Sequence, residues 1–435
     1  PAPDVFKTFQ VINPMDYTPE VTIRRPYDGS MVYMPQLNSM LLVVSAYIEH
    51  DDAINIESVS CTIDGEVVNL HTDYPDDHTN GYFYNSWTPT RFGEHNMIVE
   101  VVTSGGKVTT LNSTFTVTDE YETMDVLTIN GDLICTPSVH SAIGQYEIPS
   151  HVGAFNAITA YYDHNCVNGD CDAYDRFGGM KVRNHRGEWV EIFRYISPFG
   201  VQCEDNLDVS DYTSVLQGLV EFEFYFESWS GQGYNPTLTF NFQKGTPEYL
   251  YVDVNEIIFG TYAFGDYADQ FPIPNVNYDF APDAEKATLK ITTTGHNWSS
   301  NTAPNYTINT GNAAEFYEAT HNVVINDEIK YTQHLWRECS PNPAGCEPQY
   351  GTYYYPRSGW CPGSIALVWD WDLSEYLPAG CADIFYQFDP TYIDECHPNH
   401  PDCVDNQGGC RVCDHPDNPV LQVAAKVLTF SNNGT

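Results

Sequence analysis

The sequence predicts an all-β protein built from β-sandwiches. Short segments alternate apolar and polar residues with a period of two, and no long segment has the 3.6-residue period of an amphipathic helix. Turn residues separate these segments, for example Asp64-Gly65 and the run 104–107, as expected between antiparallel strands. The 435 residues are enough for roughly two to four domains, each with its own core.

The first 122 residues have the pattern of an immunoglobulin-like sandwich. Residues 58–63 alternate and then meet Asp64-Gly65, and the apolar run 97–102 turns back into 108–117. The acidic run 118–122 follows as a linker. We therefore expect residues 1–122 to form an accessory domain, either a spacer or a carbohydrate-binding unit.

Two further β regions follow, at residues 123–248 and 249–435. In the first, Val220, Phe222, Phe224 and Phe226 alternate with polar residues, and this pattern continues to Trp229. A period of two places Glu227 and Trp229 on the same face of the expected strand. In the second region, residues 287–292 alternate in the same way.

Composition excludes several classes of protein. The formal net charge is −41, which would repel the phosphates of a nucleic acid. No apolar run approaches the ~20 residues of a transmembrane helix, and no signal peptide opens the chain, which begins Pro1-Ala2-Pro3. The 13 cysteines include spacings typical of disulfide-stapled loops, so we expect a secreted protein, extracellular or periplasmic.

A series of short motifs carries the functional signal. It begins at 166–177 (CVNGDCDAYDRF) and continues at 187–192 (GEWVEI), 226–229 (FESW), 314–316 (AEF) and 357–363 (RSGWCPG). In order and spacing, residues ~126–435 resemble the peptide-N-glycosidase F family. The resemblance implies two adjacent eight-stranded antiparallel jelly rolls with the active site at their interface. It also implies an amidase that needs no cofactor.

Three carboxylates match the family's functional acids. Hydrolysis of a glycosylated side-chain amide needs an activated water, a proton for the departing nitrogen and a firm hold on the sugar. The resemblance assigns Asp175 as general base, Glu315 to binding the first GlcNAc and sharing the water or proton, and Glu227 as a supporting carboxylate. Without the resemblance, Asp175 would be read as half of a local ion pair and Glu227 as a solvated face residue. Glu318 is an alternative to Glu315.

The resemblance also supplies substrate-binding candidates and disulfides. Arginines can hold carboxylates and substrate in fork geometry, and aromatic rings can pack on a sugar face or simply fill a core. The substrate-binding candidates are Arg176, Arg357, Trp229, Trp360, Tyr174 and Phe316. The implied disulfides are Cys166–Cys171 and Cys339–Cys361.

The chain also departs from the family pattern. Tyr174 and Phe316 stand where the family has tryptophan, and Ala313 and Tyr317 stand where a close cysteine pair brackets the glutamate. The segment 296–311 aligns poorly. We therefore expect the loop that carries Glu315 to be either looser or supported in another way, and the preferred class of glycan stays open.

A cluster of cysteines and histidines near the C-terminus lies outside the resemblance. Its residues are Cys396, His397, His400, Cys403, Cys410 and Cys413. They offer zinc-like ligands, but beyond one C-x₂-C pair the spacing fits no zinc module. A surface loop tied by two disulfides is the favoured interpretation, and no metal is expected.

Three functions compete. The first is hydrolysis of the Asn–GlcNAc amide of N-glycoproteins and N-glycopeptides by a monomeric amidase. The second is a non-catalytic glycan-binding protein, which predicts loss of carboxylates that this chain keeps. The third is a copper monooxygenase of the tandem jelly-roll type, which needs histidine ligands in both halves, whereas His164 and His185 have no His-x-His spacing.

Overall fold

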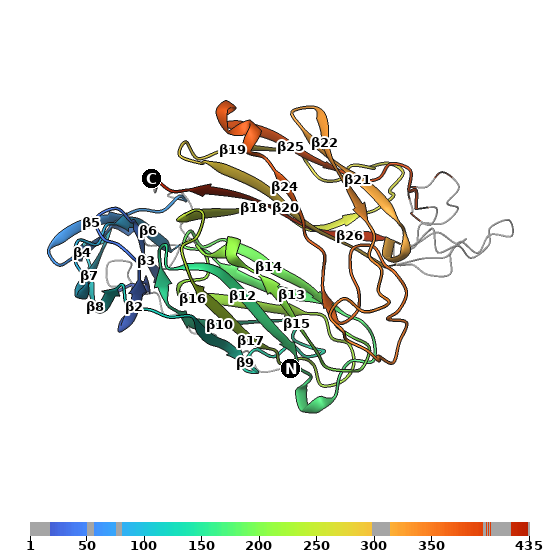
Figure 1. Ribbon diagram of the computed structural model, residues 1–435, viewed down its shortest axis with the longest axis horizontal. Coiled ribbons are helices and arrows are strands. Elements are labelled where there is room, and N and C mark those ends of the chain that lie inside the picture. Colours follow the sequence, from blue (N-terminus) through green and yellow to red (C-terminus); the bar gives the residue numbers. More distant parts are fainter. Residues whose placement is uncertain are drawn as a thin grey trace, which may run out of the picture.

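The computed structural model describes residues 18–49, 56–74, 81–297, 314–394, 397, 399, 401 and 419–433. These residues form mostly antiparallel β-sheets connected by loops and short 3₁₀ helices, so the prediction of an all-β protein is confirmed. Two strand groups are stacked on each other, and a third packs against one end (Figure 1). Within this part of the chain, no helix is long and apolar enough to cross a membrane.

The N-terminal strands form two facing sheets. The hairpin at Asp64-Gly65 is present, and both residues have positive φ, which matches the tight turn expected there. Ser150–His151 (β11) adds a parallel strand to β2, so this unit is joined to the next. One sheet has β1 (Glu20–Arg25), β3 (Leu42–Glu49) and β6 (Tyr82–Trp87), and the other has β2 (Ser30–Tyr33), β8 (Val108–Thr118), β7 (Gly93–Thr103), β4 (Ile56–Ile63) and β5 (Glu66–Leu70).

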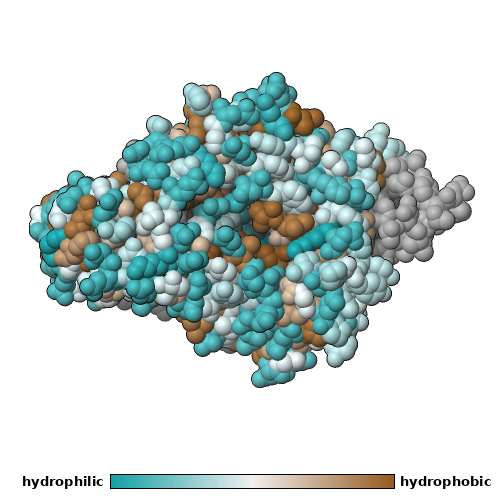
Figure 2. Space-filling model, viewed as in Figure 1, coloured by the Kyte–Doolittle hydropathy of each residue, from teal (hydrophilic) through white to brown (hydrophobic). Residues whose placement is uncertain are grey.

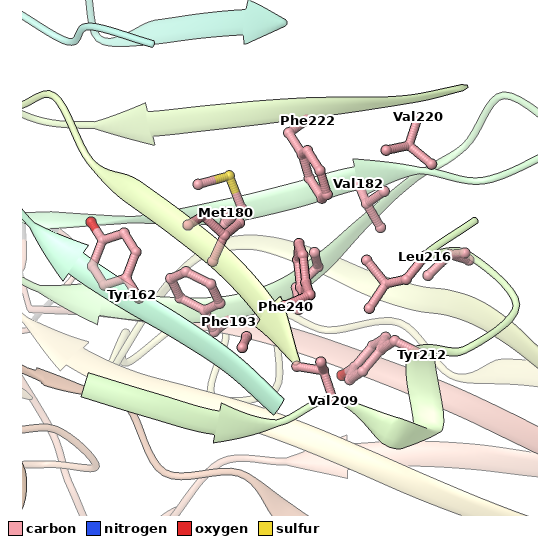
Figure 3. Packing of buried hydrophobic residues seen from close by; sticks show 14 of the residues in the cluster. Tyr162, Met180, Val182, Phe193, Val209, Tyr212, Leu216, Val220, Phe222 and Phe240 are labelled. Atoms are coloured by element: carbon pink, nitrogen blue, oxygen red, sulfur yellow. The ribbon is translucent and has the colours of Figure 1, made fainter. Parts of the chain in front are cut away.

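The first jelly roll packs two sheets around an aromatic core. One is β10 (Ser141–Ile148), β16 (Gly218–Phe226), β13 (Phe177–Arg183), β14 (Trp189–Ile196) and β23 (Ser364–Ile365), and the other is β15 (Cys203–Asp208), β12 (Phe155–His164), β17 (Thr237–Lys244) and β9 (Met124–Asn130). The apolar side of β16 is buried, and Figure 3 shows Phe222 and Val182 of one sheet beside Phe240 of the other. The strand ends at Phe226, so the expectation of one face continuing to Trp229 was wrong.

The second jelly roll repeats this two-sheet arrangement. Its long strands β18 and β26 also pack their outer ends on the first core, through Val252, Val254, Leu428 and Phe430. Its sheets are β18 (Tyr251–Ala263), β26 (Val420–Ser431), β20 (Lys286–His296) and β24 (Trp369–Asp372), then β19 (Val276–Asp279), β25 (Cys381–Gln387), β21 (Ala319–Ile325) and β22 (Glu328–Leu335). The short helices are η2 (Val167–Gly169), η3 (Ser210–Tyr212), η5 (Ala314–Phe316) and η6 (Ser374–Ala379).

The two jelly rolls are tied together at one end. Strand β23 lies late in the chain yet pairs with β14 of the first roll. The buried Arg194 of β14 donates to the carbonyl oxygen of Gln422 on β26 and to Thr294 on β20. A disulfide between Cys203 and Cys346 crosses the same junction. These links fix the loops of one roll against those of the other.

Candidate active site

Three charged residues, predicted from separate motifs, meet where the two rolls join. Asp175 lies in the loop before β13, Glu315 lies in η5, and Arg357 lies in the loop before β23. Arg357 Nε donates to Glu315 Oε1 at 2.9 Å, and Arg357 Nη2 lies 3.6 Å from Asp175 Oδ2. One buried guanidinium therefore bridges a carboxylate from each roll.

Burial gives the two carboxylates unusual proton affinities. The side chains of Asp175 and Glu315 are only 20% and 17% exposed. Burial, and next the negative charge of Asp175, raise the pKa of Glu315 to about 7, although Arg357 opposes this shift. Burial also raises the pKa of Asp175, against the attraction of Arg357 and Arg176. Glu315 thus titrates in the neutral range, where a carboxyl can both accept and return a proton.

The guanidinium of Arg357 is held on every side. Its Cζ lies 4.9 Å from the ring centre of Trp360 and 5.1 Å from that of Phe316. Its Nη1 donates to the carbonyl oxygens of Thr352 and Tyr355 at 3.1 and 2.9 Å. These contacts fix the position of the guanidinium and so help to position the carboxylates that it contacts.

A cavity of about 490 Å³ opens beside these residues, and this volume lies within the range of small-molecule binding sites. Among the predicted site residues, it is lined by Asp175, Arg176, Glu227, Glu315 and Trp360. The exposed Glu227 follows β16 directly, and its backbone N–H donates to the carbonyl oxygen of Phe177, so it lies next to the start of β13. The three predicted carboxylates thus share one cavity.

Three predicted aromatic residues lie outside the lining of this cavity: Phe316, which packs on Arg357, and the exposed Trp229 and Tyr174. Trp229 is 59% exposed and meets the ring of His140 edge-on, at 4.7 Å between ring centres. Tyr174 is 60% exposed, and the Arg176 guanidinium lies 5.3 Å from its ring centre. Trp229 and Tyr174 are available to a larger substrate, but neither shapes the cavity itself.

Asp172 is an organising residue that sequence reasoning missed. Fully buried, it accepts two hydrogen bonds from Arg176, and its other partners are the Trp229 N–H, the Ser230 N–H and hydroxyl, and the Tyr174 N–H. Burial alone would raise the pKa of Asp172, but these hydrogen bonds lower it to about 2. Asp172 therefore locks the loop of Asp175 to the loop after Glu227. The only sequence signal that could have identified Asp172 was its position within the motif 166–177.

Other cavity residues also escaped prediction. His296 stacks on Trp360 with ring centres 5.5 Å apart, and burial lowers the pKa of its imidazole to about 3. Because it stays neutral, it adds an aromatic wall rather than a charge. Thr261, Asn297, Val420 and Gln422 complete the lining on the side of the second roll, with Phe177 and Ile196 opposite. His296 begins the segment that aligned poorly, so no motif marked it.

The cysteines fall into three groups. Both disulfides implied by the resemblance, Cys166–Cys171 and Cys339–Cys361, are present, and Cys203–Cys346 is an additional one. Within the described ranges, Cys61, Cys135 and Cys381 are free. The C-terminal candidates Cys396, His400, Cys403, Cys410 and Cys413 lie outside the described residues. His397 is described, and its Nδ1 lies 3.4 Å from Asp266 Oδ1.

The geometry gives no support to a copper site in the part of the chain that the structure describes. There, no group of three or more His, Cys, Asp or Glu side chains is placed to hold a metal ion. His164 is buried in the first core, where its Nδ1 is hydrogen-bonded to the Tyr162 hydroxyl. It packs against aromatic rings rather than facing a cavity that could admit a ligand.

A second cavity, of about 460 Å³, lies where the N-terminal sandwich meets both rolls. Its lining includes Arg25, His151, His185 and Arg186, and none of the predicted site residues. Elsewhere, the face seen in Figure 2 is mostly hydrophilic, with apolar side chains in small groups. The carboxylate–arginine cluster therefore remains the strongest candidate for a catalytic site.

Fold and site together define a tandem jelly-roll protein with a carboxylate–arginine centre between its two rolls.

Comparison with known proteins gives relatives of the same fold class. Residues 266–391 match the family model described as peptide-N-glycosidase F, C terminal. A curated relative, peptide-N(4)-(N-acetyl-β-D-glucosaminyl)asparagine amidase F of Elizabethkingia miricola, is 31% identical over 234 residues. That match spans 51% of this chain and 65% of the relative, slightly less than two thirds of its length.

Solved structures share the fold. A crystal structure of peptide-N(4)-(N-acetyl-β-D-glucosaminyl)asparagine amidase superposes with a TM-score of 0.58 at 24% identity, covering 72% of this chain and 97% of that one. A structure of PNGF-II gives 0.51 at 13% identity, covering 91% of this chain and 89% of that one. Together, the sequence and structure comparisons show that this chain is similar to peptide-N-glycosidase F in its C-terminal sequence and in its fold.

Proposed function

We propose that this protein hydrolyses the amide bond between an asparagine side chain and its N-linked glycan, releasing the whole glycan and leaving aspartate. One observation carries the proposal: Arg357 holds Asp175 and Glu315, contributed by different rolls, beside a cavity of about 490 Å³. Two carboxyl groups in unequal environments can divide the work of a base and a proton carrier. The similarity to peptide-N-glycosidase F supports the same chemistry.

Asp175 is the proposed general base. It accepts a proton from water as the water oxygen attacks the side-chain amide carbon, which gives a tetrahedral intermediate. The carbon–nitrogen bond then breaks, and the departing nitrogen receives a proton. The products are a peptide with an aspartate side chain and a glycosylamine, which later loses ammonia. We assign no metal or cofactor to any step.

Glu315 is proposed to hold the first GlcNAc and to share the proton that passes through the site. Its pKa of about 7 leaves a substantial protonated fraction at neutral pH, when it can donate a hydrogen bond to the substrate. Arg357 moderates the repulsion between the two acids, and Glu227 supports the site from across the cavity. Arg176 and Trp360 are proposed to contact the sugar, since both line the cavity.

The natural setting is proposed to be extracytoplasmic, which the three disulfides support. Substrates would then be N-glycoproteins or N-glycopeptides. The N-terminal sandwich, over residues 1–122, is proposed to be an accessory domain attached to the two rolls at 123–248 and 249–435.

The test is incubation with a defined N-glycopeptide in the presence of EDTA, followed by mass analysis of the peptide. We expect loss of the whole glycan with conversion of Asn to Asp, and Asp175→Asn to slow this by at least about 100-fold. A GlcNAc left on the peptide would mean cleavage inside the glycan and would refute the amidase. Glycan binding without cleavage of several glycopeptides would favour the lectin-like alternative.

A further inference from the structure

A tyrosine-rich loop lies beside the proposed catalytic cluster. Residues 350–355 read YGTYYY and contain no charged side chain. Tyr350 is 87% exposed, Tyr354 47% and Tyr355 48%, whereas tyrosines elsewhere in the rolls are commonly buried. Exposed rings gathered in this way are characteristic of binding surfaces, because large apolar faces left in water are unfavourable without a partner.

The loop is held rigidly at its first end. Gln349 is buried, accepts the Phe199 N–H, and donates to the carbonyl oxygens of Cys346 and Pro362. The next residue, Tyr350, donates its own N–H to the carbonyl oxygen of Phe199. The Cys203–Cys346 disulfide adds a covalent tie to the first roll just upstream. The main chain at this end of the loop is therefore fixed before any ligand binds, which reduces the conformational entropy that the loop backbone loses on binding.

At its second end the loop is held by the catalytic cluster itself. Arg357 donates to the carbonyl oxygens of Thr352 and Tyr355, while the same guanidinium contacts Glu315 and Asp175. The Tyr355 N–H donates back to Thr352, which closes a turn. Adjacent rings contact each other, with centres 5.6 Å apart for Tyr353–Tyr354 and 4.6 Å for Tyr354–Tyr355. The main chain that carries the exposed rings is thus hydrogen-bonded directly to the arginine of the carboxylate–arginine centre.

We propose that the loop 350–355 is a platform for the oligosaccharide of the substrate, and that it binds sugar rings beyond the GlcNAc that occupies the cavity. This inference rests on the proposed function for the origin of its ligand. The platform would make the enzyme favour substrates with extended glycans over those with a trimmed core.

The exposed chemistry of the loop favours a sugar over a polypeptide. Several of its main-chain groups are already used inward, by Phe199, by Arg357 and by the turn at Thr352–Tyr355. These bonds turn the main chain of Tyr350, Thr352 and Tyr355 toward the protein and leave the tyrosine side chains as the exposed part of the loop. What it presents instead are flat rings with a polar hydroxyl at the edge. This combination fits the apolar C–H face and hydroxyl rim of a sugar.

The experiment compares two glycopeptides with the same peptide, one carrying a high-mannose glycan and one trimmed to two GlcNAc residues. We expect Tyr354→Ala/Tyr355→Ala to raise KM for the long glycan by roughly tenfold, which corresponds to about 1.4 kcal/mol. The trimmed substrate should lose much less, because Ala keeps the Tyr355 carbonyl that Arg357 uses and only the rings of the platform are removed. Tyr354→Phe/Tyr355→Phe should retain most of the preference.

The matched control is Tyr161→Ala, which removes a ring that is 49% exposed on β12. Equal loss on both glycopeptides, or a loss that follows peptide length instead of glycan length, would overturn the platform. A calorimetric titration with the free high-mannose oligosaccharide tests the platform independently of the amidase activity. If the parent protein cleaves neither glycopeptide, the amidase fails, yet weaker oligosaccharide binding by Tyr354→Ala/Tyr355→Ala would still support the platform and unchanged binding would refute it.

Discussion

At the scale of single residues, the site combines groups that oppose each other. Two buried carboxylates repel, and Arg357 cannot fully offset the cost of burying them, so the pKa of Glu315 stays raised to about 7. Such a site is held together by the surrounding structure rather than by its own charges. It follows that the site lowers the stability of the fold, and that this effect can be measured.

Replacing Glu315 should reveal that cost. Because the pKa of Glu315 is raised from 4.5 to about 7 on folding, its favourable contribution is complete below pH 4.5 and is lost as the pH rises through 7. Relative to the parent protein, Glu315→Gln should therefore gain stability between pH 4.5 and pH 8, by up to about 3 kcal/mol. Urea unfolding at both pH values measures this.

The control for this prediction is Glu318→Gln. Glu318 is close in sequence, but its side chain is 58% exposed and lies 2.7 Å from His334 Nε2. We expect it to change stability by less than about 1 kcal/mol at either pH. A pH-independent difference between Glu315→Gln and the parent protein would contradict the account of the buried pair.

Asp172 should matter to both stability and rate. Asp172→Asn leaves the Arg176 guanidinium without its charged partner and weakens the ties to Trp229 and Ser230, so we expect a loss of about 3 kcal/mol in unfolding free energy. Turnover should fall more than substrate affinity, because Asp175 lies in the loop that Asp172 orders. Asp170→Asn, an exposed neighbour, should change neither. Unaltered kcat in Asp172→Asn would refute the positioning role.

At the scale of elements, the strands provide the frame and the loops carry the site. Asp175, Glu315 and Arg357 all lie in loops or short 3₁₀ turns, and each loop is fixed by contacts made far along the chain. The Cys203–Cys346 disulfide is one such contact, since it spans 143 residues. Loops of this kind depend on their anchors more than on their own conformational preferences.

Removing that disulfide should weaken the junction between the rolls. We expect Cys203→Ser/Cys346→Ser to lower the free energy of unfolding by about 2–4 kcal/mol, since the cross-link restricts the unfolded chain. It should also loosen the loop 350–355. Cys381→Ser is the matched control, because Cys381 is free and exposed. Chemical unfolding of the three proteins decides the matter, and equal midpoints would show that the cross-link adds nothing.

At the scale of the whole molecule, net charge opposes compactness. A formal charge of −41 on 435 residues creates self-repulsion that salt screens. Raising NaCl from 10 mM to 0.5 M should therefore increase Tm by a few degrees, whereas an equal osmolarity of a neutral sugar alcohol should have a smaller effect. Thermal unfolding followed by circular dichroism measures both. A falling Tm in NaCl would mean that attractive ion pairs outweigh the repulsion.

The sequence was sufficient for local structure and insufficient for long-range contacts. Period-two alternation located β16 and β20, and Asp64-Gly65 located a hairpin, because these signals depend on neighbouring residues. Sequence analysis did not predict the pairing of β23 with β14 or the hydrogen-bond network around Asp172. Both depend on partners that only the folded chain brings close. The extent of β16 was also misjudged, because alternation continues past Phe226 after the strand has ended.

The residues of the candidate site were likewise predictable only in part. Asp175, Glu227 and Glu315 came from motif resemblance rather than from their own chemistry, and the structure brings all three to one cavity. His296 and the loop 350–355 belonged to no motif. Their relevance appears only from position, beside Trp360 and Arg357 respectively.

The most direct test of the central claim is hydrolysis of an N-glycopeptide in water enriched in oxygen-18. An amidase transfers one solvent oxygen to the former asparagine side chain. We therefore predict a deglycosylated peptide whose aspartate carries one oxygen-18 atom, formed by the parent protein and not by Asp175→Asn. A deglycosylated peptide that still contains asparagine, or a label found only on the glycan, would contradict the account.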